Sequence, residues 1–224
     1  MLFDLDGTLI KYSVDRLALT DEMFRYLKSR GLFFDIYGEN DYPITLTRKT
    51  RWILESMNLP RPLISDVILS LFKIIDRYEV MATERTSVID GAYAALDLVK
   101  SMSLKCGLFT LNGRHSTFNV LKKFGFLKYF EVVVTRDDVK YLKPNPEHLM
   151  AAINLLGIKP EETVVVGDST LDVIPAAKLN ALPVAVKSGV RSVHELRAAG
   201  AKIILDSVSD FPSWFRSFFE SDFP

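Results

Sequence analysis

Hydrophobic and polar residues recur with two different periods along the chain, and the change of period separates one block of the chain from the rest. Between 14 and 85, apolar residues recur three or four positions apart, which is the spacing of one helix face. Helices are expected over 14–29, 45–57 and 63–82, with a loop at 33–43 marked by glycine, asparagine and proline. No strand is needed in this block, so it is predicted to be an all-helical unit.

From residue 86 onward, short apolar stretches alternate with helical ones. Strands are expected at 104–109, 131–135, 163–166, 184–186 and 202–205, and helices at 91–101, 116–124, 146–156, 174–179 and 193–199. A first strand at 2–5 stands before the helical block. This alternation predicts an α/β fold: a Rossmann-like parallel sheet with helices on both faces. The predicted core is 1–13 with 86–224, and 14–85 is an inserted helical unit.

Composition narrows the class of protein. The 224 residues are 48% hydrophobic and 25% charged, as in ordinary globular proteins, and 28 basic residues balance 28 acidic ones. A neutral chain has no general attraction to nucleic acid or to an anionic membrane. Apolar runs fall short of the roughly 20 residues that cross a bilayer, and no signal sequence is recognised. We therefore expect a cytoplasmic protein, and its single cysteine, Cys106, excludes an internal disulfide.

Two aspartates follow the first predicted strand. Asp4 and Asp6 are one residue apart, so they share one face of an extended chain, and Gly7 behind them permits a sharp turn. Two carboxylates this close repel each other unless a cation or a shared proton lies between them. By itself, this stretch is equally compatible with an acidic turn that has no chemical role.

Two other stretches place phosphate-binding groups beside predicted elements. Thr110 follows a strand and precedes Leu111 and Asn112, so a hydroxyl meets free backbone N–H groups at a strand end. Lys143 stands in Lys-Pro-Asn-Pro ahead of a helix, where the prolines restrict the backbone and hold the lysine in place. Taken singly, a turn-closing threonine and a surface lysine are the alternatives.

A second pair of acids follows the apolar strand at 163–166. Asp168 and Asp172 are four residues apart, which places both on one side of a helix start. Clusters of carboxylate oxygens suit Mg²⁺, and a solvated acidic loop is the alternative. Because parallel strands end at a common edge of their sheet, all four stretches, including Thr110 and Lys143, are expected to meet there.

The order of these stretches resembles the four motifs of the haloacid dehalogenase superfamily. The matching residues are Asp4-Leu-Asp6-Gly-Thr, Thr110, Lys143 and Gly167-Asp168-Ser-Thr-Leu-Asp172, and they extend over nearly the whole chain. The block 14–85 is similar to the α-helical cap of that superfamily. The sequence of residues 124–144 resembles the corresponding segment of the superfamily's phosphoglycolate-phosphatase-like branch. Asn112 stands two residues after Thr110, one position further than in many members, and its role is left open.

The resemblance implies phosphoryl transfer through an aspartyl-phosphate on Asp4. Asp6 would protonate the leaving alkoxide and then take a proton from the hydrolytic water. The implied cofactor is Mg²⁺, held by Asp4, the backbone carbonyl of Asp6 and Asp168, with Asp172 as a direct or indirect partner. The groups implied around the phosphate are Thr110, Lys143, Asn112 and the N–H groups of Leu5 and Leu111.

A cap that closes over such a site favours a small phosphorylated metabolite, phosphoglycolate-like or a sugar phosphate. The expected enzyme is a Mg²⁺-dependent phosphatase. The alternatives are a β-phosphoglucomutase-like mutase and, more remotely, a non-catalytic phospho-receiver or structural module. The aromatic tail at 211–224 is expected to pack as a terminal helix, with a dimer contact as the alternative. Monomer and homodimer are both left open.

Overall fold

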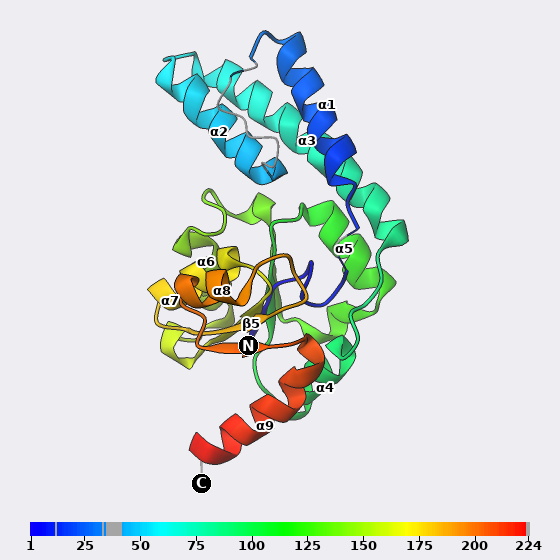
Figure 1. Cartoon of the computed structure of the whole chain (residues 1–224), viewed down its shortest axis with the longest axis vertical. Helices are drawn as coiled ribbons and strands as arrows, with labels where there is room; N and C mark the ends of the chain where they lie inside the picture. Colours follow the sequence, from blue (N-terminus) through cyan, green and yellow to red (C-terminus); the bar gives the residue numbers. More distant parts are fainter. Residues whose placement is uncertain (12, 33, 35–41, 223–224) are drawn as a thin grey trace. The chain divides into compact units, whose positions relative to one another are not determined.

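The structure is a computed structural model that describes residues 1–11, 13–32, 34 and 42–222 (Figure 1). The chain divides into two compact units. One comprises Met1–Tyr12 and Thr86–Pro224, and the other comprises Ser13–Arg85.

The first unit is built on a parallel six-stranded sheet. Its strands are β1 (Leu2–Phe3), β2 (Gly107–Phe109), β3 (Val132–Val134), β4 (Val164–Gly167), β5 (Leu182–Val186) and β6 (Ile203–Leu205). They are ordered β3-β2-β1-β4-β5-β6, and every neighbouring pair is parallel. The predicted α/β class is confirmed. Because the order reverses direction at β1, the carboxyl ends of β1 and β4 are where a sheet of this kind binds its ligand.

Helices cover both faces of this sheet (Figure 1). They are α4 (Ala92–Ser101), α5 (Arg114–Lys123), α6 (Pro146–Leu156), α7 (Thr170–Lys178), α8 (Val193–Ala199) and α9 (Phe211–Asp222). Phe3 and Leu108 pack into the core shared with α4, α5 and α9, whereas Leu2 and Phe109 pack against α6 and α7. Neighbouring residues of a strand thus serve opposite faces, as the pleat requires. Short 3₁₀ helices connect these elements: η1 (Phe126–Tyr129), η2 (Arg136–Asp138), η3 (Pro160–Glu162) and η4 (Val208–Asp210).

Helix α7 begins four residues earlier than the pattern predicts. The expected helix is 174–179, whereas α7 begins at Thr170 and has Pro175 inside it. Ser169 is the N-cap, and its side chain accepts a hydrogen bond from the N–H of Leu171 while Asp172 accepts one from the N–H of Ser169. This capping box fixes the start of the helix. Pro175 has no N–H, so it removes one intrahelical hydrogen bond in the second turn.

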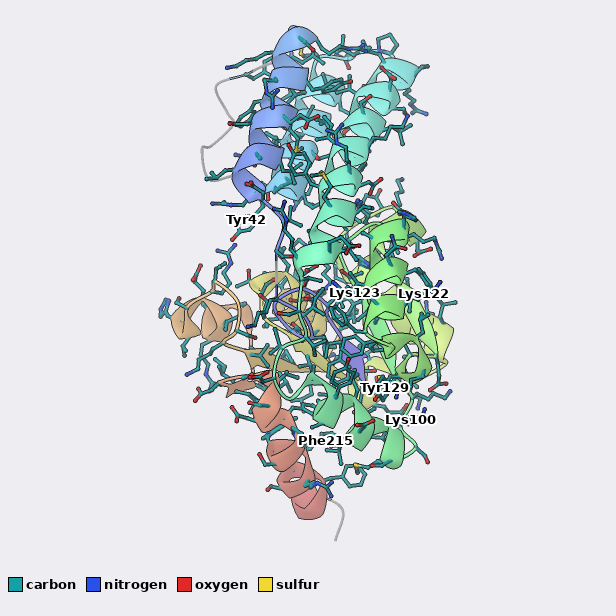
Figure 2. The ribbon with its side chains drawn as sticks, turned by 90° about the vertical axis from the view of Figure 1, so that its right-hand side faces the viewer. Tyr42, Lys100, Lys122, Lys123, Tyr129 and Phe215 are labelled. Atoms are coloured by element: carbon teal, nitrogen blue, oxygen red, sulfur yellow. The ribbon has the colours of Figure 1, made fainter. Side chains whose placement is uncertain are left out.

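The terminal helix α9 belongs to the core of the first unit, as expected for the aromatic tail. The ring of Phe211 meets that of Phe3 edge to face, with 5.7 Å between centroids. Phe215 stacks on Phe211 at 5.3 Å and lies on the side of α9 that faces α4 (Figure 2). Burying these rings removes a large apolar area from water and ties the end of the chain to the first strand.

The second unit is a three-helix bundle of α1 (Arg16–Ser29), α2 (Pro43–Ser56) and α3 (Arg61–Arg85). Its buried centre comes from one apolar stripe on each helix, including Met23, Leu54 and Leu71. The loop predicted at 33–43 lies almost entirely outside the described residues. Among the described helices, none combines the length and hydropathy that crossing a bilayer would require.

Candidate active site

The predicted site residues gather where the central strands end. Asp4 follows β1, and its backbone N–H donates to the carbonyl of Val166 in β4 at 2.9 Å. Asp168 follows β4 directly. On the other side of β1, Thr110 follows β2, and its N–H donates to the carbonyl of Val134 at 2.9 Å. The sheet therefore carries the first, second and fourth stretches to one edge, at the point where the strand order reverses.

Three carboxylates and one ammonium form the centre of this edge. Asp4, Asp168 and Asp172 each offer an oxygen, and these atoms all lie within 4.8 Å of one another. The Nζ of Lys143 lies 2.6 Å from Oδ1 of Asp4 and 2.6 Å from Oδ1 of Asp172. Thr8, which is fully buried, donates from its hydroxyl to Oδ2 of Asp4 at 3.4 Å.

The charges of this cluster do not balance. Burial raises the pKa of Asp4 to about 6, and the nearby Asp172 adds to the rise while Lys143 opposes it. Burial, with Asp4 and Asp172, also raises the pKa of Asp168 well above its usual range. Burial by itself lowers the pKa of Lys143, but Asp172 and Asp4 outweigh it, so that pKa is raised. When all three acids are ionised, one resident cation leaves two negative charges unmatched, and a divalent cation would balance them.

Glycines allow the backbone to close around Asp168. A Cβ on Gly7 would lie 2.4 Å from Oδ2 of Asp168, and one on Gly189 would lie 2.0 Å from the same atom. The hydroxyl of Ser188 donates to the carbonyl of Gly7, joining the loop after β5 to the loop after β1. Sequence reasoning missed Ser188 and Gly189. The signal available was a Ser-Gly pair one residue after a strand of the predicted sheet, which is weak because such pairs are common in turns.

Lys143 is held in place by residues that the sequence did not single out. His148, one turn into α6, accepts the backbone N–H of Lys143 at its Nδ1 at 3.3 Å. The Nζ of Lys143 lies 3.7 Å from the centroid of Phe109, whose ring also meets His148 edge to face. Burial lowers the pKa of His148 to about 3, with a further contribution from the Lys143 charge, so the imidazole is neutral. A neutral Nδ1 without a proton is what the hydrogen bond from Lys143 requires.

The remaining predicted residues lie beside this cluster. Asp6 directs its carboxylate to the second stretch, where Nδ2 of Asn112 donates to its Oδ2 at 2.5 Å. The N–H of Asn112 donates to the hydroxyl of Thr110 at 3.2 Å, and Thr110 is 1% exposed. Among the described residues, the carboxylates close enough together to hold one metal ion are those of Asp4, Asp168 and Asp172, and the group does not include the carboxylate of Asp6. This arrangement is compatible with the expectation that Asp6 would meet a metal through its backbone carbonyl.

Known proteins resemble the chain in sequence and in fold. The pyrophosphatase PpaX of Halalkalibacterium halodurans is 30% identical over 223 residues, covering 94% of this chain and 93% of that protein. A hydrolase from Pseudomonas syringae superposes with a TM-score of 0.71 at 24% identity, covering 96% of this chain and 97% of that one. A β-phosphoglucomutase from Clostridium difficile superposes with a TM-score of 0.70 at 19% identity, covering 99% and 96%.

The family profile described as haloacid dehalogenase-like hydrolase matches residues 1–186, which include all four stretches. The match thus spans the helical unit and the sheet through β5. The resemblance inferred from the motifs is confirmed: this chain belongs to the haloacid dehalogenase-like hydrolase family.

Proposed function

We propose that this protein is a Mg²⁺-dependent phosphatase that hydrolyses a small phosphomonoester through an aspartyl-phosphate on Asp4. The observation that supports this most directly is the bridge of Lys143 between Asp4 and Asp172 at the sheet edge, with Asp168 beside them. A buried carboxylate beside a fixed ammonium is placed to attack a phosphate whose oxygens the ammonium can also contact.

Two displacements at phosphorus account for the reaction. In the first, an oxygen of Asp4 bonds to phosphorus, the bond to the ester oxygen breaks, and Asp6 gives its proton to the departing oxygen. In the second, a water oxygen bonds to phosphorus, the bond to Asp4 breaks, and the water's proton returns to Asp6. Lys143 and Thr110 neutralise and hold the oxygens that do not react.

The residues present fit a magnesium ion. Asp4, Asp168 and Asp172, with the backbone carbonyl of Asp6, would hold it, because all are hard oxygen ligands and the carboxylates lie within 4.8 Å of one another. When bound, the ion supplies positive charge that offsets repulsion between a carboxylate and a phosphate dianion. Gly7 and Gly189 support this assignment, since side chains there would collide with Asp168.

A specific observation favours a second candidate substrate. The relative that is 30% identical over nearly its whole length is named a pyrophosphatase. Inorganic pyrophosphate is therefore proposed beside phosphoglycolate-like esters and sugar phosphates. We further propose that the helical unit is a cap that contributes to substrate choice. The mutase alternative has the same catalytic residues and differs in passing the phosphoryl group to a sugar.

The test is a panel of pyrophosphate, 2-phosphoglycolate and hexose phosphates assayed for free phosphate, with Mg²⁺ and with EDTA. Release of phosphate from one of them with Mg²⁺ only is the expected result. Isomer formation without net phosphate release would favour the mutase. Asp6→Asn should lower kcat by about 10² or more, the usual size of general acid–base effects. Inactivity toward the whole panel, or full activity of Asp6→Asn, would overturn the assignment.

A further inference from the structure

Asn112 touches the proposed acid/base residue and the phosphate-binding stretch at the same time. Its Nδ2 donates to Oδ2 of Asp6 at 2.5 Å, a contact between residues 106 positions apart. Its backbone N–H donates to the hydroxyl of Thr110. The amide must face Asp6 with its NH₂ group, because its carbonyl oxygen would repel the carboxylate. Asn112 therefore links Asp6 to the loop that follows β2.

Arg136 in turn holds the backbone on which Asn112 stands. This arginine is only 4% exposed. Its Nη1 donates to the carbonyl of Leu111 at 2.8 Å, and its backbone N–H donates to the carbonyl of Asn112 at 3.2 Å. The backbone carbonyls of Leu111 and Asn112 are thus both bound by one residue of η2. A guanidinium withdrawn from water is costly unless its donors are used, and the bond to the carbonyl of Leu111 uses one of them.

The same segment is tied to η2 at its other end. The backbone N–H of Arg114 donates to Oδ2 of Asp137 at 2.7 Å, and its guanidinium forms an ion pair with Asp138. Asp138 also accepts from the N–H and the hydroxyl of Thr135, which caps η2. The loop between β2 and α5 is therefore clamped at both ends by the turn that follows β3.

This clamp has a consequence for proton transfer at Asp6. The amide hydrogen bond from Asn112 holds one oxygen of the Asp6 carboxylate, so the loop after β2 sets the direction in which that carboxylate points. In the two displacements, the departing ester oxygen and the entering water occupy the same apical position. One correctly aimed oxygen can serve both steps, and a misplacement of about 1 Å costs on the order of 10²-fold in rate.

We propose that Asn112 and Arg136 are positioning residues for the acid/base step: Asn112 orients Asp6, and Arg136 acts through Asn112. This inference rests on the proposed phosphatase function. It differs from the expectation that Asn112 binds the substrate phosphate, since its amide nitrogen is already directed to Asp6. A phosphate ligand would affect binding of every ester alike, whereas a residue that aims a proton matters most when the leaving group needs one.

The leaving group provides the test. The enzyme is assayed with Mg²⁺ on 4-nitrophenyl phosphate, whose phenolate leaves without a proton, and on the best alkyl ester of the substrate panel. Asn112→Ala is expected to lower kcat on the alkyl ester by about 10- to 100-fold, with a clearly smaller loss on the nitrophenyl ester. KM and inhibition by inorganic phosphate should stay unchanged. Equal losses on both esters, or a raised KM with normal kcat, would overturn the proposal.

A mutant cycle distinguishes action through Asp6 from a separate role. In the Asp6→Asn background, Asn112→Ala should cause little further loss on the alkyl ester, because the group that it positions is already disabled. Full additivity of the two losses would contradict the proposal. An inactive wild type would instead refute the phosphatase function itself, so the two failures are distinguishable.

Arg136 is tested with a graded pair and matched controls. Arg136→Lys retains a donor for the carbonyl of Leu111 and should keep more alkyl-ester activity than Arg136→Met, with the same leaving-group dependence. Arg136→Lys also gives a result if the methionine variant does not fold. Arg197 on α8 binds the carbonyls of Ala201 and Lys202, and Asn119 lies on the exposed side of α5. Arg197→Met and Asn119→Ala should leave both activities unchanged. If Arg136→Lys and Arg136→Met both kept the wild-type ratio of alkyl-ester to nitrophenyl-ester rates, the arginine would have no part in positioning Asp6.

Discussion

Replacing Lys143 with methionine is the most informative change, because it leaves the buried acids without their resident cation. The Lys143 side chain is 1% exposed, and its partners Asp4 and Asp172 are 11% and 4% exposed, so water cannot replace the lost contacts. Removing one partner of a buried ion pair costs about 3–5 kcal/mol. We expect Lys143→Met to lower the free energy of unfolding by that amount at about pH 8 in EDTA, where the acids are least able to take up protons.

The dependence on pH and magnesium follows from the same charges. The pKa of Asp4 is already raised to about 6 by burial, and loss of Lys143 removes the group that opposes this rise. A raised folded-state pKa stabilises the fold at low pH, and this contribution is lost as pH rises through it. The penalty of Lys143→Met should therefore shrink toward about pH 5.5, by about 1.4 kcal/mol per pH unit for one bound proton. Mg²⁺ should also reduce the penalty, because it supplies the missing positive charge.

The assay can be confined to the unit that holds the site. The two tryptophans lie in different units, Trp52 on α2 and Trp214 on α9. In a Trp52→Phe background, urea unfolding followed by Trp214 fluorescence reports on the sheet-containing unit. The control is Lys187→Met, which removes an exposed ion pair with Asp206 and should cost at most about 1 kcal/mol. If Lys143→Met were no more costly than this control at about pH 8, the charge argument would be refuted.

Three further predictions test other parts of the site and core. His148→Asn keeps an acceptor for the N–H of Lys143 but cannot titrate. Because the pKa of His148 is lowered from 6.5 to about 3, the free energy of unfolding of the wild type should fall by about 2 kcal/mol more than that of the variant between about pH 7 and about pH 5. Equal decreases for the two proteins, measured by urea unfolding, would contradict this. Gly189→Ala pushes a methyl group into Asp168 and should weaken Mg²⁺ activation by about 10-fold or more, whereas Val190→Ala next to it, at an exposed position, should not; magnesium titrations of the rate compare them. Burial raises the pKa of Cys106 to about 12, so a thiol reagent at about pH 8 should label it only after unfolding, and rapid labelling of the native protein would count against its burial.

The sequence by itself determined the secondary structure and the set of residues that could take part in the chemistry. The spacing of apolar residues indicated the helices and strands, because one buried face per element requires a period of 3.6 or 2 residues. Asp4, Thr110, Lys143 and Asp168 were recognisable because they follow strands or precede a helix, where side chains and backbone groups are free to meet a ligand. The α/β class followed from the alternation of elements, and family membership from the order of the motifs.

Only the tertiary structure decided which of these groups touch. That β1 lies between β2 and β4 depends on pairings between residues more than a hundred positions apart, and no local pattern specifies them. The bridge of Lys143 between Asp4 and Asp172 is a product of that strand order. Arg136 resembled an ordinary surface residue in an Arg-Asp-Asp turn, yet it is buried against the loop that carries Asn112. Contacts of this kind arise when separate segments are packed together, so their physical cause lies in the assembled fold rather than in the neighbours along the chain.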